Sequence, residues 1–216
     1  KNDRKDPKVI AGLVKEGRYM IPYLPEGVYA DLRSVSNIRF QLQSELTRIK
    51  NRISRWFNIY FPEYKKVYGN PEAISGILIL KQAPLPKDIQ ALGVEGVNRI
   101  WRDAKCRAVG IKRAKILVEA AEYSIGSQEG VVAARMEIRM LLEDYESRIT
   151  RLQEVMALIE ELVGKIPMAE KLLEIKGVGL KTVSGFLAEV GDISRFSNPK
   201  ELQKLAGLAL VENSSG

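Results

Sequence analysis

Two long segments of the chain carry apolar residues at alternating spacings of three and four. The first runs from about Asp31 to Phe61, and the second covers Gln128–Ile166. This spacing puts the apolar side chains on one narrow stripe of an α-helix, which is the pattern of a coiled-coil seam. The seam positions are Leu42, Leu46, Ile49, Ile53, Trp56 and Tyr60 in the first segment and Ile138, Leu142, Tyr145, Ile149, Leu152, Met156, Ile159, Val163 and Ile166 in the second. We therefore predict two helical arms that pair, either within one chain or between two chains.

The segment between the arms, residues 62–126, is interrupted by glycine and proline at 69–71, 84–86 and 93 and carries short apolar runs. These features predict a helical insertion made of small helices. It contains the most basic window of the chain, in which only Asp103 is acidic. Its cations are Arg99, Arg102, Lys105, Arg107, Lys112, Arg113 and Lys115. Such a cluster is either a solvated helix surface or a contact for nucleic-acid phosphates.

The two ends differ from the arms. Residues 1–27 contain a helix-like run from about Pro7 to Lys15 and then a short extended stretch, as at the end of a larger domain. Residues 167–216 predict a compact unit of three or four short helices. The expected organisation is therefore mainly α, with arms over residues 28–166 and a separate C-terminal domain.

Composition narrows the classes of function. Of 216 residues, 45% are hydrophobic, which is enough for a buried core, and 34 Lys and Arg against 27 Asp and Glu give a net charge of +7. This charge favours an anionic partner, either nucleic acid or an anionic membrane surface. The apolar runs are far shorter than the roughly 20 residues that span a bilayer. With one cysteine, Cys106, and no histidine, we expect a reducing, cytoplasmic compartment. We also expect no catalysis by a histidine base, unless another chain or a segment outside this one supplies it.

The strongest local motif is the run from Leu172 to Val183, which has glycines at 177 and 179 between two apolar segments. It resembles a helix-hairpin-helix DNA-binding motif, although an ordinary corner between two helices is the alternative. Leu172 and Ile175 are expected to pack, and the start of the second helix is expected to meet a phosphate oxygen. The candidate DNA-binding residues are Lys176, Gly177, Val178, Gly179, Lys181 and Thr182.

The segments that follow extend this resemblance. They are Glu-x-Gly-Asp-Ile-x-x-Phe from Glu189 to Phe196, a Gly-Leu pair at 207–208 and Ser215-Gly216. Together they resemble the C-terminal domain of DEDD transposases of the insertion-sequence 110 family, which are RNA-guided serine-type recombinases. The resemblance implies that Ser215 is the nucleophile, with Ser214 as the neighbouring alternative. Without the preceding match, this serine-rich end is merely a flexible tail.

The N-terminus provides a second match. Asp3 and Asp6 lie three residues apart, on one face of a helical turn, where they could either hold a divalent cation or stabilise a helix N-terminus. In the family, a Lys-x-Asp-x-x-Asp segment opens a helix of a RuvC-like (RNase H-type) α/β domain. The resemblance implies that residues 1–27 are the remnant of this domain, that Asp3 and Asp6 bind Mg²⁺, and that the first two acids of the set lie outside this chain.

Our leading hypothesis is a DNA transposase that cuts and rejoins strands through a phosphoserine link and needs no nucleotide cofactor. The resemblance implies DNA and a guide RNA as partners, with a homo-oligomer formed through the arms, no membrane, and a prokaryotic, nucleoid-associated location. It also implies that the chain is a fragment that ends at the nucleophile. The alternative is a non-catalytic DNA-binding and dimerisation module. A purely structural adaptor leaves the glycine hairpin and the charge unexplained.

Overall fold

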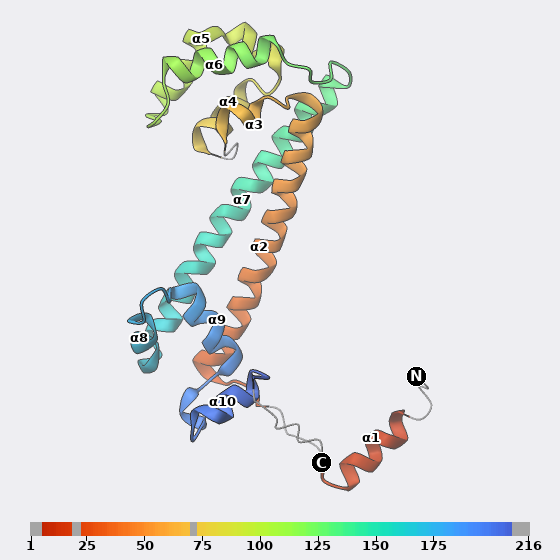
Figure 1. The fold of residues 1–216 in the computed structure, drawn as a ribbon, viewed down its shortest axis with the longest axis vertical. Coiled ribbons are helices and arrows are strands. Elements are labelled where there is room, and N and C mark those ends of the chain that lie inside the picture. Colours follow the sequence, from red (N-terminus) through yellow and green to blue (C-terminus); the bar gives the residue numbers. More distant parts are fainter. Residues whose placement is uncertain (1–5, 19–22, 70–72, 209–216) are drawn as a thin grey trace, which may run out of the picture. The chain divides into compact units, whose positions relative to one another are not determined.

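The computed structural model of the chain describes residues 6–18, 23–69 and 73–208, and every regular element in these ranges is a helix (Figure 1). This confirms the mainly α prediction. None of the described helices is long and apolar enough to cross a membrane. The elements are α1 (Asp6–Lys15), α2 (Gly27–Tyr60), α3 (Tyr64–Tyr68), α4 (Ile74–Gln82), α5 (Pro86–Asp103), α6 (Ile111–Glu122), α7 (Val131–Gly164), α8 (Pro167–Leu173), α9 (Leu180–Val190), the 3₁₀ turn η1 (Ile193–Arg195) and α10 (Pro199–Leu205).

The chain divides into two compact units, which we describe separately. Residues 37–158 form the arm unit, and residues 1–36 together with 159–216 form the terminal unit. Both long helices, α2 and α7, run from one unit into the other. The domain boundaries expected at residues 27 and 166 remain a prediction.

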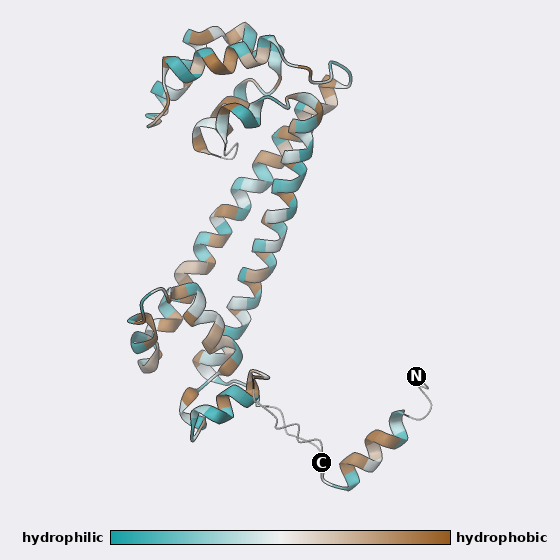
Figure 2. Cartoon of the chain, viewed as in Figure 1, coloured by the Kyte–Doolittle hydropathy of each residue, from teal (hydrophilic) through white to brown (hydrophobic). Residues whose placement is uncertain are grey.

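In the arm unit, α2 and α7 run antiparallel. The Trp56 indole N–H donates to the Ala134 carbonyl oxygen at 2.9 Å, and the Arg148 guanidinium lies 2.6 Å from the Glu45 carboxylate. Lower residue numbers of α2 therefore lie beside higher residue numbers of α7, which is the antiparallel arrangement. Figure 2 shows apolar and polar positions alternating along both helices. The seam of α2 is buried at Leu46, Ile49, Ile53 and Trp56. The arms therefore pair within one chain in this unit.

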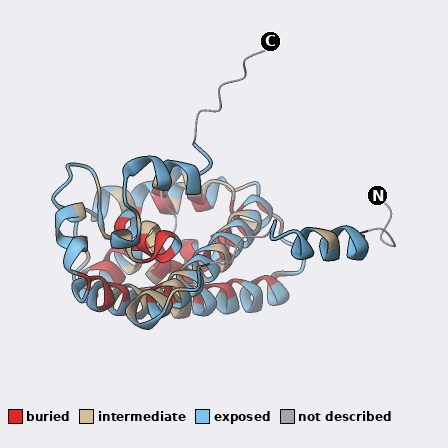
Figure 3. Ribbon diagram, turned by 90° about the horizontal axis from the view of Figure 1, so that it is seen from below, coloured by how far each residue is buried: buried red, intermediate tan, exposed pale blue. Residues whose placement is uncertain are grey.

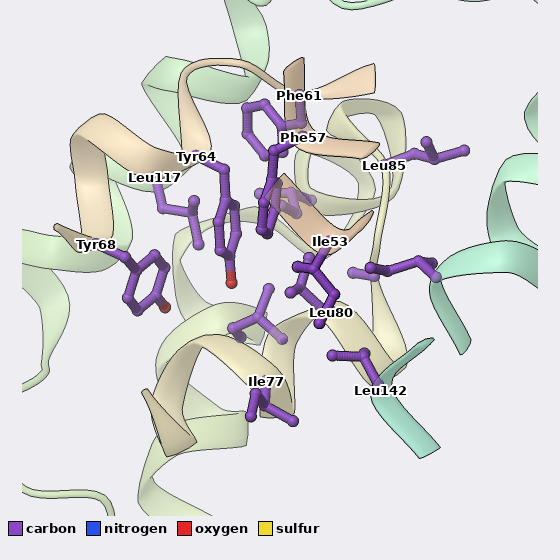
Figure 4. Packing of buried hydrophobic residues seen from close by; sticks show 14 of the residues in the cluster. Ile53, Phe57, Phe61, Tyr64, Tyr68, Ile77, Leu80, Leu85, Leu117 and Leu142 are labelled. Atoms are coloured by element: carbon purple, nitrogen blue, oxygen red, sulfur yellow. The ribbon is translucent and has the colours of Figure 1, made fainter. Parts of the chain in front are cut away.

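Aromatic rings fill the core where α3 to α6 pack on the end of α2 (Figure 4). The Tyr64 ring stacks on Phe57 at 4.8 Å and on Tyr68 at 4.7 Å between centroids. The Tyr64 hydroxyl donates to the Gly76 carbonyl oxygen at 2.8 Å, and burial raises the pKa of Tyr64 well above its ordinary value. Each such ring pair contributes about 0.5 to 1.5 kcal/mol beyond its buried area. The insertion is therefore held on the arms by a tightly packed aromatic cluster.

The loop between α6 and α7 is fastened to the end of α2. The Ser127 amide donates to the Ile59 carbonyl oxygen at 2.8 Å, and a Cβ at Gly126 would lie only 2.0 Å from the Tyr60 carbonyl oxygen. The Ser124 hydroxyl donates to the Glu63 carboxylate at 2.7 Å. Burial alone would raise the pKa of Glu63, but hydrogen bonds from Ser124 and from the Ile125 amide hold it below its ordinary value.

The terminal unit has an aliphatic core in place of an aromatic one. Its buried side chains come from the first part of α2, the last part of α7, and α8 and α9. They are Leu32, Val35, Ile159, Leu162, Val163, Ile166, Ala169, Val183, Leu187, Ala188 and Val190. Helix α1 buries none of its residues (Figure 3). Its exposed Val9, Ile10 and Val14 form an apolar face that nothing among the described residues covers.

Candidate nucleic-acid interface

Helices α8 and α9 flank a tight turn in which one glycine is conformationally required. Gly177 adopts φ +87°, a left-handed conformation that favours glycine. Gly179 has φ −104° and ψ 174°, which any residue can adopt, so its small size matters only for close approach of a ligand. The Val178 amide donates to the Ile175 carbonyl oxygen at 2.9 Å and closes the turn. The backbone thus reverses sharply between the two helices at the predicted place.

The side chains around this turn are open to solvent. Lys176, Lys181 and Thr182 are exposed, and Val178 is half-buried. Ile175, which we expected to pack inside, is 52% exposed, so that part of the prediction is wrong. The turn begins directly after α8 ends at Leu173, and it directs Ile175 away from the core. Val183 and Leu187 of α9 provide the buried contacts instead.

The first turn of α9 has free donors. No side chain caps this helix. Its first turn is closed by the Thr182 and Val183 amides, which donate to the Gly179 carbonyl oxygen at 2.9 and 3.1 Å. The Leu180 and Lys181 amides precede this closure and point out of the helix end, as the first amides of any helix do. Backbone donors, the helix dipole and two nearby lysines together make a favourable environment for a phosphate group.

The second predicted surface lies where α5 passes into α6 in the arm unit. We call it the basic cluster, and its members are Arg99, Arg102, Lys105, Arg107, Lys112, Arg113 and Lys115. All except Arg113 are exposed. The Arg113 guanidinium lies 5.7 Å from the Tyr68 ring centroid, so this residue also has a structural contact. Among the described residues, no ion pair involves the cluster, which leaves its charge available to an anionic ligand.

The basic cluster stands on a rigid support. Helices α5 and α6 pack through Val97, Trp101 and Leu117, all of which are buried. The Trp101 indole N–H donates to the Ser75 carbonyl oxygen at 2.9 Å. Two residues of the linking loop, Lys105 and Ala108, have φ of +52° and +59°, which is an unusual conformation for residues with a side chain. The loop therefore turns abruptly and keeps the cations close to one end of the helix pair.

Sequence reasoning missed a contact in the terminal unit that joins the segment before α2 to the segment after α9. The Arg195 guanidinium lies between two rings, 3.9 Å from the Tyr23 centroid and 4.4 Å from the Phe196 centroid, and donates to the Val190 carbonyl oxygen at 3.0 Å. The Tyr23 ring also covers Gly191, where a Cβ would lie 2.4 Å from the ring. No spacing in the sequence could have revealed this contact, because its partners are far apart along the chain.

Residues of the Glu-x-Gly-Asp-Ile-x-x-Phe segment have structural roles. Gly191 ends α9 with φ +72°. The Asp192 carboxylate accepts the Ser194 amide at 2.9 Å and caps η1, and this hydrogen bond holds the pKa of Asp192 below its ordinary value. Burial raises the pKa of Tyr29, and the neighbouring Asp192 raises it further. The segment thus shapes the end of the hairpin and does not present a free carboxylate pair.

Of the predicted catalytic residues, the structure describes Asp6 alone. Asp6 is exposed in the first turn of α1, where its charge also favours the helix. Asp3, Ser214 and Ser215 lie outside the described residues. Within the described part of the chain, no group of three or more histidine, cysteine or acidic residues could hold a metal ion. The carboxylate set and the nucleophile therefore remain predictions.

Comparison with known proteins identifies the protein family. A family model described as Transposase IS116/IS110/IS902 family matches residues 169–216, and so covers the hairpin. A second model, described as Transposase and built on the DEDD proteins of insertion sequence 110, matches residues 1–62. The chain belongs to the insertion-sequence 110 family of transposases. The two matches lie at opposite ends of the sequence, and the first of them includes the long helix α2.

Named relatives agree with this assignment. The chain is 25% identical to an insertion element IS110 protein of 43.6 kDa from Streptomyces coelicolor. It is 26% identical to an IS116 protein from Streptomyces clavuligerus and 26% identical to an IS900 protein from Mycobacterium paratuberculosis. Each match includes the whole of this chain and 54% of the relative, so the chain spans about half the length of the curated relatives it matches. No solved structure matches the chain at a significant level.

Proposed function

We propose that the parent protein is a DNA transposase that cuts and rejoins strands through a serine nucleophile, and that the described part of the chain holds the DNA. The observation that carries this proposal is the hairpin. The match to the transposase family model includes a sharp turn at Gly177, followed by a helix with no side-chain cap and with exposed Lys176 and Lys181. The basic cluster adds a contact that needs no particular sequence.

In this proposal the Ser215 hydroxyl oxygen attacks the phosphorus of a phosphodiester. A phosphoserine bond forms, the bond to one deoxyribose oxygen breaks, and that oxygen leaves with a proton. A deoxyribose hydroxyl of the new partner strand later attacks the same phosphorus and releases the serine. Because the phosphoserine bond preserves the energy of the phosphodiester, the reaction needs no nucleotide cofactor.

The chemistry of Asp6 fits a role in binding Mg²⁺. Its carboxylate is exposed and has no ion-pair partner among the described residues, and Mg²⁺ prefers oxygen ligands. Asp3, three residues earlier in the sequence, would be a further ligand, and the rest of the set would come from other parts of the protein. A bound Mg²⁺ would lower the pKa of the serine hydroxyl and stabilise charge on the phosphate.

Other partners are part of the same proposal. A guide RNA and a second copy of the chain are implied by the family, as is action at the nucleoid of a prokaryotic cell. The half-buried positions Tyr145, Ile149 and Leu152 of α7 leave apolar surface along the arm that a second copy could cover. A homo-oligomer would also fit a reaction on two DNA strands.

The test uses the full-length parent protein and a labelled DNA substrate. We expect Ser215→Ala to abolish a covalent protein–DNA adduct while DNA binding stays nearly unchanged, because one hydroxyl contributes little to a phosphate-dominated interface. Ser214→Ala is the matched control and should keep the adduct. Asp6→Ala should suppress the adduct, with partial recovery at high Mg²⁺ or Mn²⁺.

The alternative is a non-catalytic DNA-binding and dimerisation module, which the hairpin, the basic cluster and the paired arms would also suit. Binding without any adduct in the full-length protein would favour it. Cleavage without an adduct would instead indicate a metal-dependent nuclease. An adduct that survives Ser215→Ala but not Ser214→Ala would move the nucleophile by one residue.

A further inference from the structure

The outer face of α2 in the arm unit carries three arginines in a row. Arg48, Arg52 and Arg55 are spaced by four and three residues, so they share one face of the helix. All three are exposed, and they lie away from the seam formed by Leu46, Ile49, Ile53 and Trp56. The arginine stripe, as we call these three residues, belongs to neither the hairpin nor the basic cluster.

In the described ranges of the chain, carboxylates do not neutralise this stripe. No ion pair among the described residues involves Arg48, Arg52 or Arg55. The acid nearest to them along α2, Glu45, is engaged by Arg148 of α7 at 2.6 Å. Without another protein group to bind, the three guanidinium groups are available to a ligand.

The two long helices of the arm unit also differ in charge. Between residues 37 and 60, α2 carries five Lys and Arg and one acid, whereas residues 131–158 of α7 carry four Arg and five acids. A solvated surface chosen only for solubility would mix both signs on each helix. Positive charge is instead concentrated on α2, where it attracts a polyanion.

Spacing and chemistry identify the ligand. Seven residues of α-helix rise by about 10 Å, so the three guanidinium groups are spread far enough apart to meet different phosphates of a duplex. Arginine binds phosphate oxygens through two parallel N–H groups, and Asn51, exposed on the same helix between Arg48 and Arg52, offers a further donor.

We infer that Arg48, Arg52 and Arg55 form a second binding site, which holds the phosphate backbone of a duplex nucleic acid along α2. This inference rests on the proposed function, because it assumes that the chain works on nucleic acid. The helix beneath the stripe is well supported, since Ile53 and Trp56 are buried and the Trp56 indole donates to Ala134. Little conformational entropy is therefore lost when this surface binds a ligand. DNA and a helical RNA present the same phosphate chemistry, so the test includes both.

The experiment measures duplex binding as a function of salt for this chain and two charge-matched variants. The stripe variant is Arg48→Gln, Arg52→Gln and Arg55→Gln. The control variant is Lys87→Gln, Arg139→Gln and Arg151→Gln, which changes three cations of the same unit that are exposed and form no ion pair among the described residues. Fluorescent DNA and RNA duplexes of the same sequence serve as probes, and circular dichroism checks the fold.

We expect the stripe variant to bind on the order of a hundredfold more weakly at low salt, with a log–log salt slope reduced by about three. The control should stay within about threefold of the unchanged chain. Replacing the three arginines by lysines should restore the slope but only part of the affinity, because the charge returns without the paired donors. The duplex that shows the loss, DNA or RNA, identifies the source of the phosphates.

Two failures are distinguishable. If the unchanged chain binds neither duplex at low salt, the proposed function itself fails. If the chain binds but the stripe and control variants have the same slope, only the inference about α2 is overturned, and the hairpin and the basic cluster remain as the binding surfaces.

Discussion

The arm unit and the terminal unit are stabilised in different ways. The arm unit buries Trp56, Phe57, Phe61, Tyr64 and Trp101 almost completely. The terminal unit has a smaller, aliphatic core and leaves Ile175, Leu173 and Leu205 at least 40% exposed. Large rings bury more area per residue than aliphatic side chains, so the arm unit has the larger reserve of stability.

The difference corresponds to the two kinds of nucleic-acid contact that we propose. The arm unit presents charges on well-supported helices, as in the basic cluster and the arginine stripe. The terminal unit presents backbone donors at a turn, which depends on the conformation of Gly177 and on a modest core. We therefore expect substitutions that crowd the backbone to reduce stability most in the arm unit. In the terminal unit we expect substitutions that change the backbone conformation of the turn to reduce nucleic-acid binding most.

The largest effect is expected at Gly126 of the arm unit. Gly126→Ala would place a Cβ 2.0 Å from the Tyr60 carbonyl oxygen, and neither group is the flexible end of a side chain. We expect a loss of about 3 kcal/mol of unfolding free energy, measured by urea denaturation. Gly164→Ala, where nothing lies within 4 Å of the added Cβ, is the control and should be neutral or slightly stabilising. Equal stability of the two variants would contradict the close approach of the loop to α2.

A smaller effect is expected at Gly191 of the terminal unit. Gly191→Ala combines φ +72° with a Cβ 2.4 Å from the Tyr23 ring. We expect a loss of about 2 kcal/mol, since a left-handed residue with a side chain costs about 1 to 2 kcal/mol and the ring can move aside. In a Tyr23→Ala background the same substitution should cost less, because the collision is removed. Identical costs in both backgrounds would show that Tyr23 does not cover Gly191.

The smallest effect concerns pH and Glu63. Its pKa is held below the ordinary value by hydrogen bonds from Ser124 and Ile125. The bound carboxylate therefore adds stability that is complete above the ordinary glutamate pKa and is lost as pH falls through the lowered value. We expect Glu63→Gln to reduce stability by less than about 1 kcal/mol at neutral pH and to weaken its decline toward acid. Thermal melts between neutral and acidic pH measure this, and an unchanged acid slope would contradict it.

The repeating parts of the fold were predictable from the sequence. The seams predicted α2 and α7, because burial on one face of a helix leaves a periodic signal. The turn at Gly177 was predictable because two glycines interrupt two apolar runs. The end of the chain could be linked to a transposase only through its resemblance to a family, since a serine-rich tail has no physical signature of its own.

Contacts between distant parts of the chain left no such signal. Tyr23 and Arg195 meet only because the segment before α2 lies against the end of α9, and Gly126 is required only because Tyr60 lies beside it. Ile175 looked like a core residue because it is apolar, but the turn carries it outward. The arginine stripe did have a signal, since three arginines at helical spacing share an exposed face of α2 beside its seam.

The central claim is that the turn between α8 and α9 binds a phosphate of DNA, and a paired glycine substitution tests it most directly. Gly177→Ala strains a left-handed residue by about 1 to 2 kcal/mol, whereas Gly185→Ala lies within α9 and meets nothing within 4 Å. In a titration with duplex DNA at low salt, we predict that Gly177→Ala binds about tenfold more weakly, while Gly185→Ala binds like the unchanged chain. DNA affinity that is the same for both variants, with both folded, would contradict the claim.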